Sequence, residues 1–527
     1  MIRRRALLRT GAAAALAAPR LARAAAETTL RFVPQTDIAG YDPVWSSAQV
    51  TRNYAYLVFD TLYGVNSAYE AKPQMAEGAV HNGDHTDWTV TLRPGLRFHD
   101  GDPVLARDCV ASLIRWGKRD SFGQPLMDAT EEISAPDDRT IRFRMKRAFP
   151  LLEDALAKSS ANMAGMMPER LAKTDPYKQI AEVVGSGPFR LVPEEGVSGA
   201  RVVFARNADY VPRGDGVPEW TSGPKVVHFD RVEWQIIPDA ATAAAALQNG
   251  EVDWWEAPTT DYLSLLRGAR DVKVALTDPS GSMPVLRMNW LYPPFDNPAI
   301  RRAVLAATSQ LDFMQAVAGN DPSLYRTGVG VFPPGTVFAS DAGIEAVRGT
   351  PDFARIRRDL AAAGYKGERV VVLGTSDRAA VKAMGDVAAD MLAKMGMNVD
   401  YQIGEWAAVN ARSVRKDPPD KGGWNVFFGI WSGLSTINPV VHQSLRGNGA
   451  AGWTGWPTSP RLEALRAAWL DAPDLAAQKR IAADMQVTAF EEVPYVPLGQ
   501  FFQPVAYRAN LSGIVTGFPI FWNVRRG

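Results

Sequence analysis

The chain is poor in the residues that carry redox and metal chemistry, because its 527 residues include one cysteine and five histidines. A single cysteine, Cys109, excludes a disulfide framework and a cluster of thiolate metal ligands. An excess of positive charge is also missing, since 58 Lys and Arg stand against 57 Asp and Glu. This balance argues against a nucleic-acid partner. Hydrophobic residues make up 46% of the chain, which argues against disorder and allows a large core.

Long hydrophobic runs are absent as well. The apolar run near the N-terminus extends only from Gly11 to Ala18 and stops at Pro19. Crossing a bilayer takes roughly 20 apolar residues, so neither this run nor any other segment predicts a membrane anchor. No cysteine lies close to this run, so we expect no lipid attachment either.

The first 26 residues instead predict a removable export signal. The run RRALLR at 4–9 fits the core of a twin-arginine signal, and ARA at 22–24 supplies the small residues that a signal peptidase needs. We expect cleavage near residues 24–26 and a periplasmic mature protein. A basic amphipathic helix of the mature fold is the alternative, but Ala and Gly give such a helix almost no distinct apolar face. Removing the six arginines of this segment leaves 52 basic and 57 acidic residues, a net charge of −5.

Strand-like and helical patterns alternate along the rest of the chain. Residues 29–34 and 86–92 have the composition of strands, and residues 103–115 place apolar side chains at helical spacing. A single helix is expected over residues 297–319, because Asn297 is a good N-cap and a glycine closes the apolar pattern. No repeat period links these segments.

A clearer pattern covers residues 369–403. Residues 369–373 are a β-branched run, residues 381–395 form one apolar helical face rich in methionine, and residues 397–403 are strand-like again. This order, with short connections, predicts a βαβ unit and therefore a parallel strand pair in a buried sheet. The expected fold class is α/β, with the methionines in the core rather than at a ligand.

Signatures of common catalytic sites are missing. There is no G-x-S-x-G elbow, no G-x-x-x-x-G-K-[ST] loop, no H-E-x-x-H and no C-x-x-C. His81 and His85 lie close together, but the turn residues between them favour a solvated loop over a metal pair. We therefore expect no catalytic residue, no metal site and no cofactor. A secreted hydrolase whose catalytic groups come from distant positions stays open as an alternative.

Six motifs follow one another along nearly the whole chain after the signal. They are WTVTLRPGLRFHDGDPV at 88–104, GSGPF at 185–189, RNADY at 206–210, LQNGEVD at 247–253, PFDNPAIRRA at 294–303 and LAAAGY at 360–365. In this order they resemble the peptide and nickel class of ABC-transporter solute-binding proteins, called extracellular solute-binding family 5. The resemblance implies the periplasmic component of an importer, which captures a small peptide-like or anionic solute and delivers it to ABC permease subunits without performing chemistry. It also implies a monomer.

The same resemblance implies a two-lobe periplasmic binding protein clamp of class II, the Venus-flytrap type, with an extra inserted domain. Lobe I would combine residues 27–60, 189–280 and 497–527. The extra domain would be residues 61–188, and lobe II residues 281–496. Ligand would lie in the cleft between the lobes.

The family layout implies two walls for that cleft. One is the loop after the first strand, with Tyr41, Asp42, Trp45 and Ser46 as expected ligand-binding residues. The other contains Arg378, Trp424, Trp431, Ser432, Gly433, Leu434, Asn438 and His442. The second wall also stands out by composition, because residues 421–462 include four tryptophans and no acidic residue. Such a gap indicates burial or a selective cleft, with a tryptophan-rich core edge as the alternative.

The second wall departs from the family pattern. Peptide-binding members carry W-x-G-D here, and the acid of this motif pairs with the amino group of the peptide. The present chain ends the motif in Leu434, and it has Asn438-Pro439 where D-P is usual. A buried ammonium needs a paired charge, because its desolvation is costly. We therefore hypothesise that no free α-amino group is held by this wall. An N-blocked peptide, an opine-like or sugar-phosphate-like anion, or another neutral or anionic solute would fit.

Two further residues bear on the ligand. Arg378 lies near the position where dipeptide binders carry a carboxylate-binding arginine, and a guanidinium binds a carboxylate through two parallel hydrogen bonds. A solvated arginine in the first turn of a helix is the alternative. His442 keeps a nickel-chelate binding protein open as a further alternative, although one histidine without a nearby cysteine or carboxylate is a weak metal site.

Overall fold

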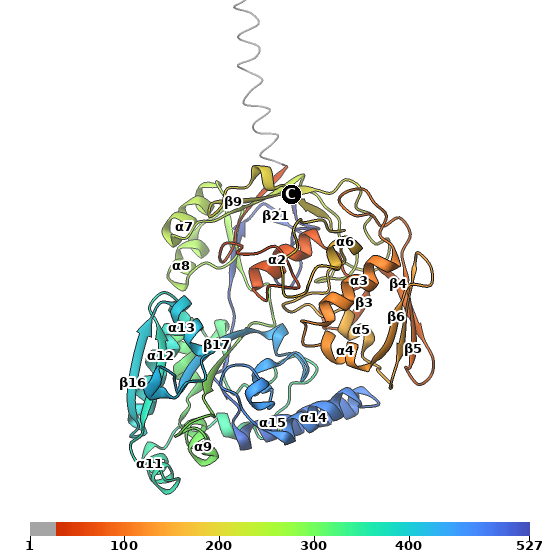
Figure 1. Cartoon of the computed structure of the whole chain (residues 1–527). Helices are drawn as coiled ribbons and strands as arrows, with labels where there is room; N and C mark the ends of the chain where they lie inside the picture. Colours follow the sequence, from red (N-terminus) through yellow and green to blue (C-terminus); the bar gives the residue numbers. More distant parts are fainter. Residues whose placement is uncertain (1–27) are drawn as a thin grey trace, which may run out of the picture.

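Three main β-sheets organise the part of the chain that the computed structural model describes, residues 28–527. The predicted signal peptide and its cleavage site lie outside these residues. Two of the sheets have seven strands and one has four. Figure 1 shows that each sheet belongs to a separate body, with the C-terminus in the body where the described chain begins. The fold is α/β, as predicted.

Lobe I is the body built on the first seven-stranded sheet. Its strands are β1 (Thr29–Val33), β8 (Phe189–Leu191), β9 (Arg201–Arg206), β10 (Arg231–Gln235), β11 (Trp254–Trp255), β12 (Val272–Ala275) and β20 (Val505–Arg508). Their order is β12-β20-β11-β1-β10-β9-β8, with β1 parallel to β10 and β11 and the other pairs antiparallel. Its helices are α2 (Gln49–Val58), α7 (Ala240–Asn249) and α8 (Thr260–Gly268).

Aromatic packing holds the centre of lobe I together. The ring of Phe32 on β1 lies 5.3 Å from that of Trp234 and 5.8 Å from that of Trp254, and 4.9 Å from Phe521 near the C-terminus. All four side chains are buried. Aromatic side chains bury large apolar areas, so this cluster fixes the last residues of the chain to the first described strand.

The extra domain is built on the four-stranded antiparallel sheet, with strand order β4-β5-β7-β6. Its strands are β4 (Ala76–His81), β5 (Asp87–Leu92), β6 (Thr130–Ser134) and β7 (Thr140–Met145), preceded by the hairpin of β2 (Tyr63–Val65) and β3 (Ala71–Pro73). Its helices are α3 (Ala106–Gly117), α4 (Gly123–Ala129), α5 (Leu152–Leu156) and α6 (Glu169–Ala172). Cys109 is buried on α3, as expected of a small core residue.

Lobe II is built on the second seven-stranded sheet. Its strands are β13 (Ser282–Met288), β14 (Tyr325–Arg326), β15 (Arg369–Thr375), β16 (Asn398–Gly404), β17 (Val426–Ser432), β18 (Val496–Pro497) and β19 (Gln500–Phe501). The order is β14-β19-β13-β17-β15-β16, with β18 also paired to β13. Its helices are α9 (Pro298–Ala307), α10 (Gln310–Ala318), α11 (Phe353–Ala362), α12 (Ala379–Lys394), α13 (Trp406–Ser413), α14 (Pro460–Leu470) and α15 (Leu475–Glu492). Figure 1 shows α14 and α15 on the side of lobe II that faces the extra domain.

The βαβ unit predicted for residues 369–403 is confirmed. β15 and β16 pair in parallel from Arg369 with Asn398 to Thr375 with Gly404, and α12 connects them. The methionines of the predicted helical face are buried in the core of lobe II.

The single helix expected over residues 297–319 is two helices, α9 and α10. Asn297 caps the first, as predicted, and accepts a hydrogen bond from the backbone N–H of Ala299 at 2.9 Å. The helical conformation is interrupted at Thr308 and Ser309. There the Ser309 hydroxyl caps α10 by accepting a hydrogen bond from the backbone N–H of Asp312. Ser and Thr compete for backbone hydrogen bonds and favour caps over helix interiors. The apolar periodicity continues across this interruption, so the sequence pattern did not indicate that the helix divides in two.

Two chain segments connect the lobes within the described residues. Residues 276–281 lead from β12 to β13, and residues 502–504 return from β19 to β20. Since β19 pairs with β13 and β14, the lobe II sheet extends to Phe501, beyond the boundary expected at residue 496. We therefore propose that lobe II ends after Phe501.

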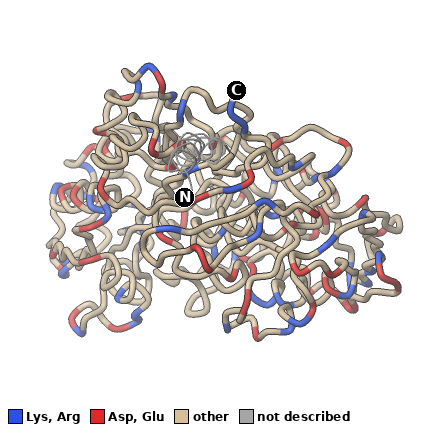
Figure 2. Tube along the Cα trace, turned by 90° about the horizontal axis from the view of Figure 1, so that it is seen from above, with Lys and Arg blue, Asp and Glu red and all other residues tan. Residues whose placement is uncertain are grey.

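Two short strands and seven 3₁₀ turns make up the remaining elements of the described residues. β21 (Leu511–Ser512) pairs with β22 (Arg525–Arg526). The 3₁₀ turns are η1 (Pro193–Glu195), η2 (Pro322–Leu324), η3 (Ile344–Val347), η4 (Pro419–Lys421), η5 (Gly433–Ser435), η6 (Gln443–Leu445) and η7 (Gly449–Ala451). Among residues 28–527, no helix has the length and apolar character needed to cross a membrane. Figure 2 shows basic and acidic residues interspersed over all three bodies.

A buried ion pair joins the extra domain to lobe I. Asp42, in the loop after β1, accepts hydrogen bonds from the Arg115 guanidinium of α3 at 3.0 and 2.6 Å. The two side chains are 0% and 1% exposed. The same carboxylate accepts from the backbone N–H groups of Val44 and Ile180. A buried charge pair of this kind stabilises the fold only while both partners are present.

Asp42→Asn should therefore destabilise the protein, because it leaves the Arg115 guanidinium buried without a counter-charge. We expect a loss of about 3 kcal/mol in the free energy of unfolding, measured by urea denaturation followed through tryptophan fluorescence. The control is Asp87→Asn, whose partner Arg142 is half exposed, with an expected loss below about 1 kcal/mol. Equal losses for the two variants would contradict the structural role of the Asp42 pair.

Candidate ligand-binding site

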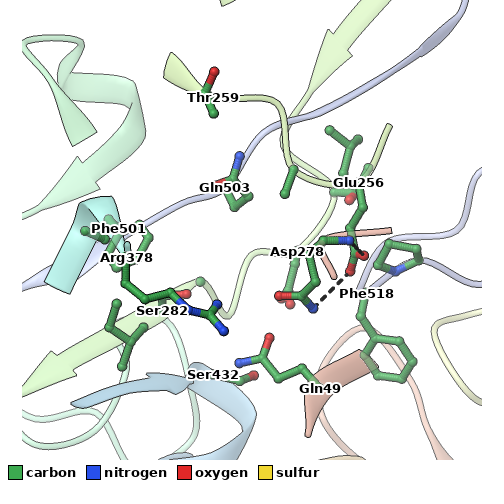
Figure 3. A pocket seen from close by; sticks show the side chains of 18 of the residues that line it. Gln49, Glu256, Thr259, Asp278, Ser282, Arg378, Ser432, Phe501, Gln503 and Phe518 are labelled. Carbon is green, nitrogen blue, oxygen red and sulfur yellow. Dashed lines mark hydrogen bonds between the residues drawn. The ribbon is translucent and has the colours of Figure 1, made fainter. Parts of the chain in front are cut away.

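A cavity of about 590 Å³ lies between the two lobes, over the segments that connect them. Lobe I contributes one wall and lobe II the other, and Gly281, Ser282, Phe501 and Gln503 lie at the crossings. Figure 3 shows the polar side chains of both walls turned toward the same space. Its volume is within the range of pockets that hold small ligands.

Strand direction explains why polar side chains meet here. β1 and β11 run in parallel in lobe I, and Gln35 and Glu256 follow their carboxyl ends. In lobe II, β15 and β17 are also parallel, and Arg378 and Ser432 lie at their carboxyl ends. All four residues line the cavity. Ligands of open α/β sheets bind outside the carboxyl ends of the strands, and here two such edges face each other.

The wall of lobe I carries a buried acid that the protein itself hydrogen-bonds. Glu256 accepts from the backbone N–H of Gln35 at 2.7 Å and from the Asn53 side-chain amide at 2.8 Å. Burial raises the pKa of the Glu256 carboxyl to about 7. Its hydrogen bonds, two of them drawn in Figure 3, oppose that rise because they favour the charged form.

Arg52 of α2 lies on the same wall. Its side chain is almost fully buried, with 4% exposed, and burial lowers the pKa of the guanidinium. Nε and Nη2 donate to the Asn53 side-chain oxygen at 3.2 and 2.9 Å, and the guanidinium carbon lies 4.0 Å from the centre of the Phe518 ring. No carboxylate among the described residues lies within ion-pair distance of it.

The first crossing brings a second carboxylate to the cavity. Asp278 accepts hydrogen bonds at one oxygen from the backbone N–H and the hydroxyl of Ser280, at 2.9 and 2.6 Å. Burial raises the pKa of this carboxyl, opposed by Ser280 and by the charge of Arg52. Lobe II packs tightly on this crossing, because a Cβ at Gly433 would lie 2.0 Å from the Ser280 carbonyl oxygen. Only glycine permits this approach.

The wall of lobe II begins at the N-terminus of α12. Arg378 is its N-cap residue, and the next three residues, 379–381, line the cavity. Asp377 fixes the preceding turn by accepting from the Thr375 hydroxyl at 2.6 Å and from the N–H of Trp406 at 2.8 Å. Figure 3 shows the Arg378 guanidinium pointing into the cavity. The positive end of a helix dipole together with a guanidinium favours an anion at this place.

Among the residues expected to bind ligand, Arg378 and Ser432 line the cavity. Ser432 is 6% exposed, and its hydroxyl is buried without a hydrogen-bond partner in the described part of the chain. Their role in binding stays a prediction.

The loop after β1, expected to form one wall, does not line this cavity, and its role in binding stays a prediction. The Asp42 carboxylate is held by Arg115, and Tyr41 packs edge-on against Tyr54 at 5.1 Å. Ser46 contacts the Thr51 hydroxyl at 3.0 Å, and Trp45 is 39% exposed at the surface. The loop turns toward the extra domain because the buried charge of Arg115 requires its carboxylate there.

The tryptophan-rich segment of the second expected wall is mainly core in the structure, and the binding role of its residues stays a prediction. Trp424 is fully buried and packs against Phe427 and Trp456, and Trp431 packs against Trp453 at 4.9 Å. The absence of acids in residues 421–462 thus accompanies burial more than a ligand. Segment 426–432 still reaches the cavity at its end, through Ile430 and Ser432.

His442 is also a core residue rather than part of the cavity lining. Its Nε2 lies 3.0 Å from the Val331 carbonyl oxygen and 2.9 Å from the Tyr495 hydroxyl. Burial, together with the charge of Arg466, lowers the pKa of this imidazole to about 3. Within residues 28–527, no cluster of three or more His, Cys, Asp or Glu side chains could hold a metal ion.

Leu434 and Asn438 lie in a separate small cavity of about 70 Å³, lined on its other side by Tyr69 and Phe122 of the extra domain. Leu434 is 3% exposed and belongs to the apolar core that the extra domain shares. The Asn438 side chain caps a turn by accepting from the N–H of Val440. The position where the family resemblance led us to expect an acid therefore lies at a contact between lobe II and the extra domain.

Sequence reasoning missed Arg52, Glu256 and Asp278. Arg52 offered a weak signal, because it is the single charged residue of α2. Glu256 follows two tryptophans that form a buried strand, so a carboxyl-end position was readable in principle. Nothing local distinguished Asp278 from an ordinary loop acid.

Comparisons with known proteins agree with this architecture. Residues 70–452 match the model of the bacterial extracellular solute-binding proteins, family 5 Middle. The chain is 34% identical, over 100% of its length and 99% of the relative's, to the probable peptide ABC transporter periplasmic-binding protein y4tO of Sinorhizobium fredii (strain NBRC 101917 / NGR234). It is 24% identical, over 90% of its length and 89% of the relative's, to the glutathione-binding protein GsiB of Salmonella typhi.

A solved structure shares the fold. The PBP AgaA of A. tumefaciens R10, in complex with agropinic acid, superposes with a TM-score of 0.79 at 20% identity, covering 95% of this chain and 99% of that one. The two-lobe fold is thus that of the class II periplasmic binding proteins, as predicted. Proteins of this family are substrate-binding components of ABC importers and not enzymes. The chain belongs to family 5 of the bacterial extracellular solute-binding proteins.

Proposed function

We propose that the protein captures a small carboxylate-bearing solute, peptide-like or opine-like, in the interlobe cavity and delivers it to an ABC permease. One observation carries this proposal. Arg378 and the first turn of α12 face the cavity together, and the guanidinium has no ion-pair partner among residues 28–527. A carboxylate placed there would satisfy the guanidinium and the unbonded N–H groups of the helix end at once.

The two crossings support a clamp that closes on its ligand. With only residues 276–281 and 502–504 between the lobes, rotation about them changes the distance between the two walls. Closure would remove water from the bound carboxylate and strengthen its contacts. The ligands named for two similar proteins, glutathione and agropinic acid, are consistent with a carboxylate-bearing solute.

The remaining parts of the proposal concern export and partners. Residues 1–26 would direct twin-arginine export with cleavage near residues 24–26, and the mature protein would work in the periplasm as a monomer that docks on the permease. Leu434 leaves the tryptophan-rich wall without a charge for an α-amino group, so any such group must be held elsewhere.

Arg378→Ala should weaken binding without weakening the fold. We expect more than a tenfold loss of affinity for the solute that gentle denaturation releases from the purified protein, measured by isothermal titration calorimetry. The melting temperature should stay unchanged, because Arg378 makes no ion pair in the described part of the chain. Arg355→Ala, on exposed α11, is the control and should bind normally. If Arg378→Ala and the control bind equally well, the carboxylate does not lie at α12.

Mass spectrometry of the released solute separates a transport receptor from a secreted hydrolase on the same clamp. A receptor should release an intact, carboxylate-bearing molecule, unchanged after hours of incubation with the protein. Conversion of the added solute into smaller products would refute a pure transport role.

A further inference from the structure

Two charged side chains of the cavity remain without an ionic partner on the side opposite Arg378. We propose that Arg52 and Asp278 form a second subsite for an α-amino-acid headgroup, with the carboxylate on Arg52 and the ammonium on Asp278. The inference rests on the proposed function, because it assumes that the solute occupies this cavity. It narrows the substrate class to solutes that carry an α-amino-acid headgroup in addition to the carboxylate proposed to bind at Arg378.

Arg52 has the geometry of a binding residue rather than of a structural one. Two of its nitrogens, Nε and Nη2, share the single Asn53 side-chain oxygen, which leaves donors of the guanidinium unused. Phe518 covers one face of the guanidinium and fixes its plane. A planar, immobilised guanidinium with open donors is suited to a carboxylate.

Asp278 offers the complementary charge. Ser280 uses one carboxylate oxygen, and no Lys, Arg or His of the described residues lies within ion-pair distance of Asp278. The Arg52 charge acts on Asp278 strongly enough to oppose the effect of burial on its pKa. Both side chains line the same cavity, so both can contact one bound ligand.

We assign no charge of the ligand to Glu256. Its oxygens accept from Gln35 and Asn53, so its bonding capacity is engaged within lobe I. Arg52, Arg378 and Asp278 line the cavity, and none of them has an oppositely charged partner within ion-pair distance in the described part of the chain. Of the three, Arg52 is almost fully buried, and a buried charge needs a partner, so a carboxylate of the ligand would fit it.

The test uses γ-glutamylglycine, which has an α-amino-acid headgroup and a distal carboxylate, with three analogues in which one charge is removed. They are the N-acetyl form, the α-carboxamide and the distal glycinamide. Calorimetric titration of the unmodified protein should give measurable binding of γ-glutamylglycine and at least a tenfold loss for each analogue. These titrations change only the ligand and use the unmodified protein, so their result does not depend on whether a protein variant folds.

Protein variants then test which side chain binds each charged group of the ligand. In Asp278→Asn the N-acetyl analogue should bind as well as γ-glutamylglycine, because the ammonium has already lost its partner. In Arg52→Gln the α-carboxamide should likewise bind as well as γ-glutamylglycine, and Arg52→Lys serves if Arg52→Gln does not fold. The controls Asp271→Asn and Arg206→Gln, both exposed on lobe I, should retain every difference between the probes.

The outcomes separate this inference from the proposed function. If no probe binds, or if Asp278→Asn and Arg52→Gln keep the same discrimination as the unmodified protein, the headgroup subsite is refuted. The proposed function survives that result as long as Arg378→Ala lowers affinity for the released solute. If Arg378→Ala has no effect while Arg52 and Asp278 discriminate as expected, the carboxylate site at α12 fails and the headgroup subsite stands.

Discussion

The cavity depends on one constraint, that only two chain segments cross between the lobes and that they run side by side in opposite directions. β12 pairs with β20 in lobe I, and β13 pairs with β19 in lobe II, so each sheet receives one strand of each crossing. The crossings thereby hold two sheet edges opposite each other. Both edges are the carboxyl ends of parallel strands. Side chains from four distant parts of the sequence therefore converge on the cavity above the two segments that connect the lobes.

Buried charges in the described part of this protein are held in different ways, and Arg287 and Arg301, for example, donate to backbone carbonyl oxygens. Asp42 with Arg115, and Asp60 with Lys225, are paired at 2.6 and 2.7 Å and join separate segments of the fold. The charged groups of the interlobe cavity instead lack ionic partners inside the protein. Leaving a buried charge unpaired is unfavourable, so a chain that keeps such groups preorganised gains binding free energy when a complementary solute supplies the missing charges.

The sequence predicted the fold more fully than the site. Family motifs implied the two lobes and the extra domain, and local periodicity was enough for the βαβ unit around α12, which also placed Arg378 at a helix start. Arg52 and Asp278 were not predicted, because their meeting depends on tertiary contacts between segments more than 200 residues apart. The sequence could not show whether the tryptophan-rich segment forms a core edge or a cleft wall, because a core and an aromatic cleft have the same composition.

The buried position of Leu434 has a consequence for how ligand preference can change in laboratory evolution. The family resemblance implied that this position faces the solute, whereas here Leu434 lies between lobe II and the extra domain. Restoring the acid would place a carboxylate in this small cavity, which is also lined by Asp154 and Lys158 and is separate from the interlobe cavity. New specificities in this chain are therefore more accessible from lobe I and the crossings, where substitutions alter the solute's surroundings without opening the interdomain core.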